Sequence, residues 1–190
     1  MPMPGTAHAG PLLQRSPGTV WITGLSGAGK TTLSRALQQR MNAAGLAVLL
    51  LDGDDVRAGL NRDLGFSSAD RTENIRRVAE VASLANRSGI WVVAAFISPL
   101  RIQRQLARDL IGSEHFIEVF LDTALDVCAR RDAKGLYAQA KAGQIGQFTG
   151  LSAPYEPPLA PALAIDTAQL TPAQAVAMIW QQLAAHQPAG

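Results

Sequence analysis

A glycine-rich octapeptide, GLSGAGKT at Gly24–Thr31, is the feature that most constrains the fold. It matches the pattern G-x-x-x-x-G-K-[ST] in full and lies between a strand-like apolar run and a helix-like stretch, as that pattern requires. Glycines let such a loop turn tightly, so that backbone N–H groups point at phosphate oxygens beside the positive end of the helix. An ordinary glycine-rich turn is the alternative, but the full match in this context predicts binding of a nucleoside triphosphate.

The residue types in the loop also predict its chemistry. In phosphate-binding loops of this kind the lysine reaches the β- and γ-phosphates, and the hydroxyl that follows it holds Mg²⁺. We therefore expect Mg²⁺ as cofactor, with Lys30 catalytic and Thr31 a metal ligand, while the loop alone does not distinguish ATP from GTP. The expected nucleotide-binding residues are Gly24, Leu25, Ser26, Gly27, Ala28, Gly29, Lys30, Thr31 and Thr32.

Two other classes that use this loop fit the sequence poorly. A GTPase would carry an Asn-Lys-x-Asp motif, and none of Lys30, Lys134 and Lys141 follows an asparagine. An ATPase of this fold would end a strand with an acidic metal ligand, and the run IWVVAAFIS at 90–98 contains no acidic residue. Carboxylates instead follow an earlier apolar run, in LDGDDVR.

Three aspartates are crowded into that short stretch, and crowding raises carboxyl pKa values unless a positive group is near. Ligands of a doubly wound sheet collect at the carboxyl ends of its strands, where this stretch and the phosphate loop both lie. We expect Asp54 to accept the proton of an attacking hydroxyl and to lie close to Mg²⁺. Asp52 would share its face and orient metal-bound water or support the loop, while Asp55 turns aside. The alternative is a helix N-cap with solvated acidic neighbours.

Strand-like and helix-like stretches alternate along the chain and predict a three-layer α/β fold of the phosphate-loop kinase type, with a parallel central sheet. Strands are expected at 19–23, 47–51, 90–96, 116–121 and 163–167, and helices at 31–45, 70–89, 99–112, 123–131 and 171–186. Asp70 is the expected cap of the second helix. Residues 1–17 are predicted to be a mobile tail, 18–190 one domain, and 132–158, rich in Gly and Pro, a lid.

The composition excludes several partners and locations. The chain has 190 residues, a net charge of +2 and a hydrophobic content of 47%, which disfavour a nucleic-acid surface and disorder. No apolar run reaches the length of a membrane span. The single cysteine, Cys128, rules out an internal disulfide and is expected to be a packed thiol, so that we expect a cytoplasmic protein with no membrane partner.

An arginine, an amide and aliphatic side chains are expected to share one face of the long helix. Spacings of three, four and seven residues place them together, and the set suits a phosphate or sulfate group beside a base or sugar. Arg57, one turn beyond Asp54, is expected to join them. Phe66 and Phe148 lie in loops and could stack on a nucleobase, although core packing is the alternative for each. The shared face consists of Arg71, Asn74, Ile75 and Val78. A solvated or salt-bridged face is expected for Arg76, Arg77 and Glu80.

At this point the sequence resembles a known family. The motifs GLSGAGKT, LDGDDVRAGLNRDLGF, DRTENIRR, FISP, RDAKGLY and FTGLSAPYE occur in the order seen in adenylylsulfate kinases, from about Gly18 to the final helix. These enzymes transfer the γ-phosphate of ATP to the 3′-hydroxyl of adenosine 5′-phosphosulfate (APS), giving 3′-phosphoadenosine 5′-phosphosulfate (PAPS) in sulfate assimilation. The resemblance also implies a homodimer and admits a functional link to an ATP sulfurylase.

The resemblance implies roles for individual residues. Asp54 would lie near the reacting hydroxyl and Mg²⁺, and Arg131 near the adenine of ATP. Phe148 would stack on the substrate adenine as the lid closes. With Asp52 added from the carboxylate cluster, the expected substrate-binding residues are Asp52, Arg57, Phe66, Arg71, Asn74, Ile75, Ser98, Lys134 and Phe148.

Some questions stay open from the sequence alone. Ser98, expected to be catalytic, would either contact the substrate or carry a phosphoenzyme, and direct in-line transfer needs no intermediate. Asp55 stands where the family usually has Asn, and Ala133 where it usually has Pro; neither removes a group that the reaction needs. The alternative functions are another small-molecule kinase, acting on shikimate, gluconate or a nucleoside, and a non-catalytic nucleotide-binding partner of an ATP sulfurylase.

Overall fold

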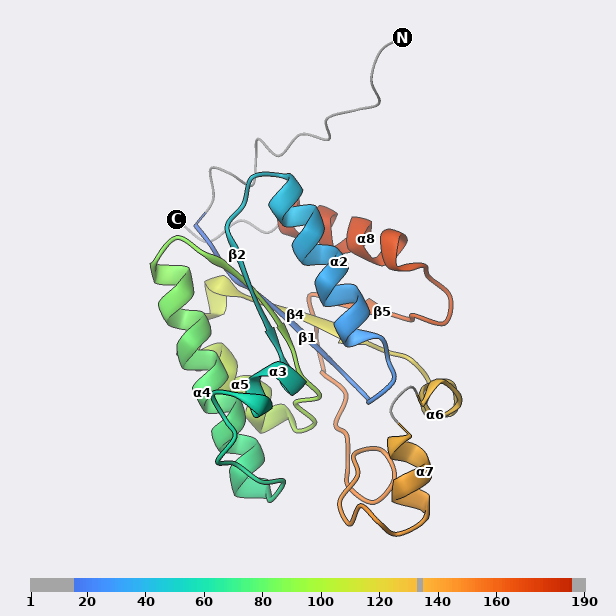
Figure 1. Ribbon diagram of the computed structural model, residues 1–190. Helices are drawn as coiled ribbons and strands as arrows, with labels where there is room; N and C mark the ends of the chain where they lie inside the picture. The colour runs from blue at the N-terminus through green and yellow to red at the C-terminus, as the bar shows by residue number, and fades with distance from the viewer. Residues whose placement is uncertain (1–15, 133–134, 186–190) are drawn as a thin grey trace.

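A central parallel sheet with helices on both faces forms the body of the computed structural model, which describes residues 16–132 and 135–185 (Figure 1). The predicted three-layer α/β class is thereby confirmed. The strand order is β2-β3-β1-β4-β5, and all neighbouring strands pair in parallel. The strands are β1 (Thr19–Gly24), β2 (Val48–Asp52), β3 (Trp91–Ala95), β4 (Phe116–Leu121) and β5 (Leu163–Ile165).

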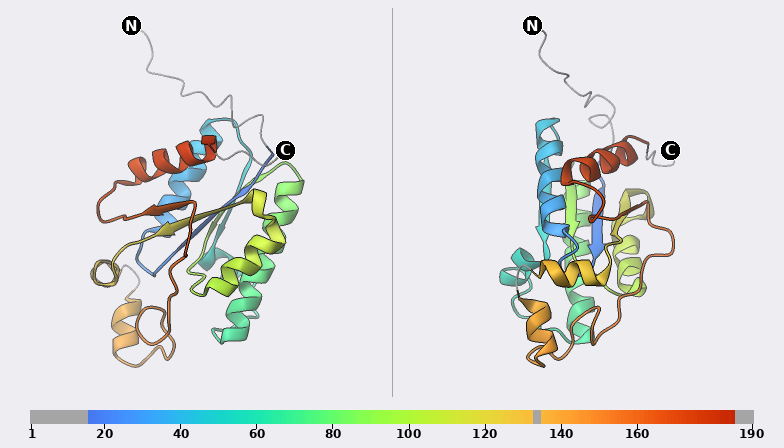
Figure 2. Two further views of the ribbon diagram at one scale, coloured as in Figure 1. Left: turned by 180° about the vertical axis from the view of Figure 1, so that it is seen from behind. Right: turned by 90° about the vertical axis from the view of Figure 1, so that its right-hand side faces the viewer.

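The helices fall into two covering layers and a group at one edge of the sheet. Helices α2 (Lys30–Ala43) and α8 (Pro172–Ala185) cover one face, and α4 (Ser68–Arg87) and α5 (Arg101–Ile111) cover the other (Figure 2). The group at the edge consists of α3 (Gly53–Ala58), α6 (Leu125–Arg131) and α7 (Leu136–Lys141), beyond the carboxyl ends of the strands. The 3₁₀ turn η1 (Ser113–His115) directly precedes β4 and lies at the opposite edge. None of the helices in the described ranges is long and apolar enough to cross a membrane.

Alternation along β1 explains why its whole sequence is apolar or small. Val20 and Ile22 pack under α2 and α8, whereas Trp21 packs with α4 and α5 against Phe96 and Phe116. Successive side chains of a strand point to opposite faces, and both faces here are covered, so every residue of β1 is buried. The strand ends at Gly24, where the glycine-rich loop begins.

The start of α4 differs from the prediction. Its cap is Ser67, whose hydroxyl accepts the Asp70 backbone N–H at 3.1 Å and donates to the Asp70 carboxylate at 2.8 Å. Asp70 is therefore not the cap but the acidic residue three positions after it. The prediction was wrong by one turn because a second serine-or-aspartate start, with Glu73 in the corresponding place, gives the same sequence pattern.

Two short helices were not predicted. Six-residue α3 follows β2 directly, and six-residue α7 lies inside the segment 132–158, to which we give the name lid segment. Neither is long enough to show a clear helical period. The lid segment lies beyond the carboxyl ends of the strands (Figure 1), and its Phe148 and Thr149 are buried. Most of the expected tail, residues 1–15, lies outside the described residues, as do Ala133 and Lys134.

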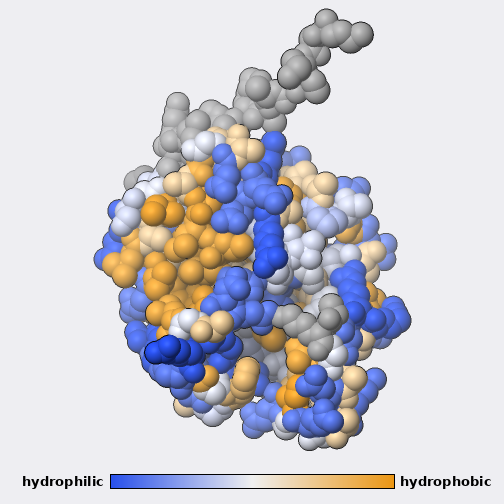
Figure 3. All heavy atoms as spheres, in the orientation of Figure 1, coloured by the Kyte–Doolittle hydropathy of each residue, from blue (hydrophilic) through white to orange (hydrophobic). Residues whose placement is uncertain are grey.

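An apolar patch covers one edge of the sheet. Figure 3 shows it over edge strand β2 and the C-terminal half of α4. In these two elements Leu84 of α4 is 57% exposed, and the side chains of Val48, Leu49, Leu50 and Val81 are half-buried. No strand in the described part of the chain pairs with the outer edge of β2.

Candidate active site

Glycine is required in the phosphate loop by the backbone geometry. Gly27 has a φ of 77°, and a Cβ there would lie 2.6 Å from the backbone oxygen of Cys128. Gly29, which immediately precedes α2, has a φ of 94°. A side chain at Gly27 would meet both left-handed strain and a backbone clash, so the loop can keep this shape only with glycine at that position.

The lysine of the loop is folded onto the loop itself. Lys30 Nζ donates to the backbone oxygens of Gly24 at 2.9 Å and Leu25 at 2.7 Å. Its ammonium group therefore lies at the mouth of the loop, where phosphate oxygens would be its stronger, charged partners.

Asp52 connects the loop to α3. One carboxylate oxygen accepts the Thr31 hydroxyl at 2.8 Å, and the other accepts the Asp54 backbone N–H at 3.0 Å. Asp52 is 4% exposed and caps α3, so the cap alternative weighed for this cluster applies to Asp52 itself. Asp54 and Asp55 lie exposed in the first turn of α3, so Asp52 and Asp54 do not share a strand face as expected. The chain becomes helical after Asp52, so that the alternation of side chains between the two faces of a strand ends at that residue.

The expected metal ligands, Thr31 and Asp54, and the neighbouring Asp52 offer oxygen atoms of the kind that Mg²⁺ binds. Magnesium in phosphoryl-transfer sites takes one or two protein oxygens and completes its shell with waters and phosphates. The Thr31 hydroxyl and the Asp52 carboxylate are in contact beside the loop, with exposed Asp54 two residues on. In the described ranges no three His, Cys, Asp or Glu residues gather as a cage. This arrangement fits a cation that arrives with a nucleotide.

Arg57 of α3 and Arg71 of α4 are both held by backbone oxygens of the loop between these two helices. The Arg57 guanidinium lies 4.5 Å from the centre of the Phe66 ring and donates to the Gly65 oxygen at 2.9 Å. Arg71 donates to the Phe66 oxygen at 2.9 Å, and in the lid segment to the Gln147 oxygen at 2.7 Å and the Thr149 hydroxyl at 3.0 Å. Arg71 therefore ties α4 to the lid segment.

The guanidinium groups of Arg57 and Arg71 are partly buried, so that a bound anion would stabilise their charge. Burial, followed by the like charge of Arg71, lowers the pKa of Arg57, and burial also lowers the pKa of Arg71. The two arginines stay charged at neutral pH, because a guanidinium titrates far above it. Two partly desolvated cations beside an exposed aromatic ring, Phe66, suit an anionic nucleotide.

The two predicted aromatic contacts differ in exposure. Phe66 is 65% exposed, whereas Phe148 is 7% exposed and packs edge-on against Tyr137, with ring centres 4.8 Å apart. Tyr137 donates its hydroxyl to the Ser26 oxygen of the phosphate loop at 2.9 Å. Burial raises the pKa of Tyr137 to about 12, which keeps this donor protonated. Phe148 thus belongs to the packing that joins the lid segment to the loop.

Ser98 has an unusual backbone and a fully engaged hydroxyl. Its φ is 36°, in the left-handed region, and it is 3% exposed. The hydroxyl accepts from Trp21 Nε1 at 3.1 Å and donates to the Thr23 hydroxyl at 3.1 Å. Thr23 also shares a hydrogen bond of 2.9 Å with the Tyr155 hydroxyl of the lid segment. The hydroxyl of Ser98 is therefore part of an internal chain from β1 to the lid segment.

A buried arginine that the sequence reasoning missed holds the same region. Arg104 is 3% exposed and donates to the Ser98 and Glu156 backbone oxygens, each at 2.6 Å. Its Nε lies 2.8 Å from a carboxylate oxygen of Glu118 on β4. An available signal was that Arg104 shares a helical face with buried Ala107 and Ile111, where a charge is out of place.

Arg131 lies beside the phosphate loop, with a guanidinium nitrogen 3.4 Å from the Gly27 oxygen. It donates to the hydroxyl and the backbone oxygen of Thr167, both at 2.8 Å. Thr167 in turn donates to the Ala28 oxygen of the loop at 2.9 Å. Thr167 was not predicted, since a threonine after a short strand carries no sequence signal. Lys134, the remaining expected substrate residue, lies outside the described residues.

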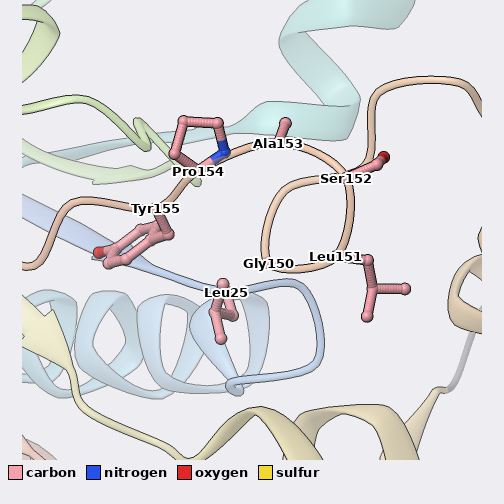
Figure 4. Close-up of a pocket in the computed structure, with 7 residues that line it drawn as sticks. All are labelled: Leu25, Gly150, Leu151, Ser152, Ala153, Pro154 and Tyr155. Atoms are coloured by element: carbon pink, nitrogen blue, oxygen red, sulfur yellow. The ribbon is translucent and has the colours of Figure 1, made fainter.

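A groove opens between the phosphate loop and the lid segment. Figure 4 shows Leu25 of the loop facing Tyr155 and the turn at Gly150. A second molecule could approach the loop through this groove. It is lined by Leu25, Gly150, Leu151, Ser152, Ala153, Pro154 and Tyr155.

Comparison with known proteins bears on this arrangement. The model of the adenylylsulphate kinase family matches residues 16–166 of the chain. An adenylyl-sulfate kinase of Pseudomonas entomophila is 52% identical over 169 residues, which are 89% of this chain and 81% of that protein. The bifunctional enzyme NodQ of Rhizobium tropici is 54% identical over 163 residues, or 86% of this chain, but the chain spans only 26% of its length.

A solved structure extends the likeness to three dimensions. The APS kinase CysC of Mycobacterium tuberculosis, in complex with AMPPNP and APS, superposes with a TM-score of 0.85 at 43% identity. The superposition covers 88% of this chain and 98% of that one.

Proposed function

Because the chain belongs to the adenylylsulfate kinase family, we propose that it transfers the γ-phosphoryl group of ATP to the 3′-hydroxyl of APS, giving ADP and PAPS. One observation carries this proposal beyond family likeness. The phosphate loop, the aspartates that follow β2 and the two arginines of α3 and α4 lie around one edge of the sheet. They are linked through Asp52 on one side and the lid segment on the other.

On the nucleotide side, the loop would bind the phosphates of ATP. The Lys30 ammonium would exchange the oxygens of Gly24 and Leu25 for those of the β- and γ-phosphates. Arg131 and Thr167 would flank the adenine. Thr31, Asp52 and Asp54 would hold Mg²⁺, which when bound neutralises charge on the phosphate oxygens.

On the acceptor side, Asp54 would act as the general base. Its exposed carboxylate accepts the proton of the 3′-hydroxyl while that oxygen forms a bond to the γ-phosphorus and the bond from phosphorus to the ADP oxygen breaks. Ser98 carries no phosphoryl group in this scheme, because its buried hydroxyl is engaged with Trp21 and Thr23. Ser98 instead joins the segment that follows β3 to β1 through these two hydrogen bonds.

The anionic groups of APS would be met by the charged and amide side chains of α3 and α4. Arg57, Arg71 and Asn74 supply donors to the phosphosulfate, with Phe66 and Ile75 as apolar walls. Lys134 would add a further cation. To stack on the adenine, Phe148 would have to give up part of its contact with Tyr137. The lid segment would have to move for this to happen.

Closing of the lid segment would keep water away from the phosphoryl group. Tyr155 contacts Thr23, and Arg71 contacts residues 147 and 149, so the segment already touches both sides of the site. Exclusion of water suppresses hydrolysis of ATP while the acceptor is bound.

Partners and location follow from the same assignment. A homodimer would bury the apolar patch over β2 and α4, and Leu84→Glu would then shift the mass measured by light scattering toward the monomer. In the bifunctional enzyme NodQ, a region similar to this chain makes up only 26% of a longer protein, so such a region can occur in one polypeptide with a second activity. The functional link to an ATP sulfurylase, which the family resemblance admits, would be a partnership of this kind. A buried, unpaired Cys128 suits the cytoplasm.

Product analysis tests the proposal. The purified protein is incubated with Mg-ATP and APS, and the mixture is examined by mass spectrometry for a product heavier by one phosphoryl group. Shikimate, gluconate and adenosine serve as parallel acceptors. We expect PAPS from the mixture that contains APS, and no phosphorylated product from the three other acceptors. ADP without PAPS, or phosphorylation of another acceptor instead, would overturn the assignment.

A further inference from the structure

A fully buried asparagine between α3 and α4 faces an asparagine of the acceptor side. Asn61 is 0% exposed, and its backbone N–H donates to the Val56 oxygen near the end of α3 at 2.9 Å. Its Nδ2 donates to the Asn74 side-chain oxygen at 2.9 Å and lies 3.5 Å from the Asn74 backbone oxygen. Asn61 therefore meets both the side chain and the backbone of Asn74.

This double contact decides which way both amides point. The two ends of an asparagine side chain have nearly the same shape, so their orientation must come from the hydrogen-bonding partners. A backbone oxygen accepts only, and so Asn61 must turn its nitrogen toward Asn74. The Asn74 side chain must then offer its oxygen to that nitrogen, because two amide nitrogens at this distance would repel. What remains of the Asn74 amide is its Nδ2, a donor of two hydrogen bonds.

The arrangement leaves one polar atom unsatisfied. The Asn61 side-chain oxygen is buried, and no donor among the described residues reaches it. A buried acceptor without a partner destabilises the folded state, and each such atom in a native structure calls for an explanation. Orientation of Asn74 supplies one, since no hydrocarbon side chain at position 61 could donate to Asn74.

A second buried asparagine on α4 shows what a purely structural amide looks like. The Asn86 side-chain oxygen accepts from the Thr19 hydroxyl at 2.8 Å, and its Nδ2 donates to the Ile90 oxygen at 3.0 Å. Both ends of Asn86 serve to join α4 to the sheet and to close the turn that follows the helix. Asn61 satisfies one end only, and that end faces a residue of the acceptor side.

We propose that Asn61 is a positioning residue, which fixes the Asn74 amide so that its N–H donors face an acceptor atom of the substrate. The proposal rests on the proposed function, in which Asn74 contacts APS. Arg71 lies one helical turn before Asn74 on the same face of α4, so in the proposed function both residues would serve the same substrate. The acceptor side thereby selects a group that accepts hydrogen bonds there, such as a phosphate or sulfate oxygen, over one that donates.

Substitution by leucine separates positioning from packing. Asn61→Leu removes the donor and also the unsatisfied oxygen, so we expect KM for APS to rise about tenfold, the value of one oriented hydrogen bond, while KM for ATP stays the same. The melting temperature should change little, because the variant exchanges one unsatisfied oxygen, that of Asn61, for another, that of Asn74. Asn86→Leu is the matched control, and it should lower the melting temperature without changing KM for APS. Asn61→Ala repeats the kinetic test with a side chain that fits without strain.

A double substitution shows whether Asn61 acts through Asn74. In the Asn74→Ala background, Asn61→Leu should raise KM for APS no further. Additive effects, an unchanged KM for APS in the single variant, or an equal rise in both KM values would overturn the proposal. The wild-type protein is measured in parallel. If it makes no PAPS the proposed function fails and this inference with it, whereas PAPS from the wild type with an unaffected Asn61 variant refutes the inference alone.

Discussion

The nucleotide side and the acceptor side of the site are held by different kinds of contact. The phosphate loop is closed on itself by Lys30, which bonds oxygens five and six residues away, and hydrogen bonds from Tyr137 and Thr167 support it from outside. Arg71 on the acceptor side instead bonds lid-segment residues that are 76 and 78 positions away. The phosphate loop therefore takes its shape mainly from its own glycines and lysine, whereas the acceptor side is formed only where α4 meets the lid segment.

This difference has a functional meaning. A preformed loop loses little conformational freedom when it binds phosphates, whereas an assembled site can open and close around an acceptor. Substitutions on the nucleotide side should therefore affect ATP, and those on the acceptor side should affect APS and leave ATP alone. Each of the following tests can break that separation.

The largest effect is expected where the two sides meet. Asp54→Asn keeps the shape of the side chain but removes the base, so turnover should fall by about 10²–10⁴-fold with ATP affinity retained. Asp55→Asn is the matched control, because Asp55 is also exposed in the same helical turn, and it should change turnover little. Steady-state PAPS formation and ATP titration give the two quantities. Loss of activity in both variants alike would remove the assignment of Asp54.

The next effect tests the rigidity of the loop. Gly27→Ala places a methyl group 2.6 Å from the Cys128 oxygen at a φ of 77°, and it should weaken ATP binding by about tenfold or more through backbone strain. Gly89→Ala has the same kind of strain, with a φ of 83°, but meets no atom within 4 Å. Calorimetric titration with ATP should separate the two variants. Equal affinity in both would show that the loop tolerates a side chain there.

A smaller effect is expected at the link between α4 and the lid segment. Arg71→Lys keeps the charge but loses the forked contact with Gln147 and Thr149, so KM for APS should rise about tenfold while KM for ATP holds. Cleavage by trypsin after Lys141 should also become faster. Arg76→Lys, on the exposed face of the same helix, is the control. A matching rise in KM for ATP would contradict the separation of the two sides.

The smallest effect concerns the exposed ion pairs of α4. Hydrogen bonds from Arg76 and Arg77 lower the pKa of Glu73 from 4.5 to about 2 in the folded protein. A lowered carboxyl pKa stabilises the folded state above pH 4.5, and this contribution is lost as the pH falls toward 2. Glu73→Gln should therefore flatten the loss of stability across that range, as measured by urea unfolding. An unchanged pH dependence would mean that the solvent screens these pairs completely.

The same contrast explains which parts of the molecule the sequence could predict. The loop, the parallel sheet and the five strands follow from local pattern, because glycine spacing and alternation are properties of short stretches. Helix α3 was not predicted, because six residues are too few to show a helical period. Its cap in the structure is Asp52. The role of Asp52 could be named only in part, as support for the loop.

The long-range contacts could not be predicted from the sequence. Nothing in the order of residues indicates that Asn61 faces Asn74, that Thr167 supports the loop or that Arg104 joins Ser98 to Glu156. Each contact depends on how separate segments pack, and neither propensity nor spacing encodes that. The predicted salt-bridged face of Arg76, Arg77 and Glu80 was confirmed, since neighbours three and four apart on a helix do meet.

Direct passage of the phosphoryl group between the two sides is what the whole arrangement implies. The most direct measurement uses ATP made chiral at the γ-phosphorus with the three stable isotopes of oxygen, followed by determination of the configuration at that phosphorus in PAPS. A single in-line transfer to the 3′-hydroxyl predicts inversion of configuration. Retention would require two displacements, through a phosphorylated side chain such as Ser98, and would contradict direct transfer assisted by Asp54.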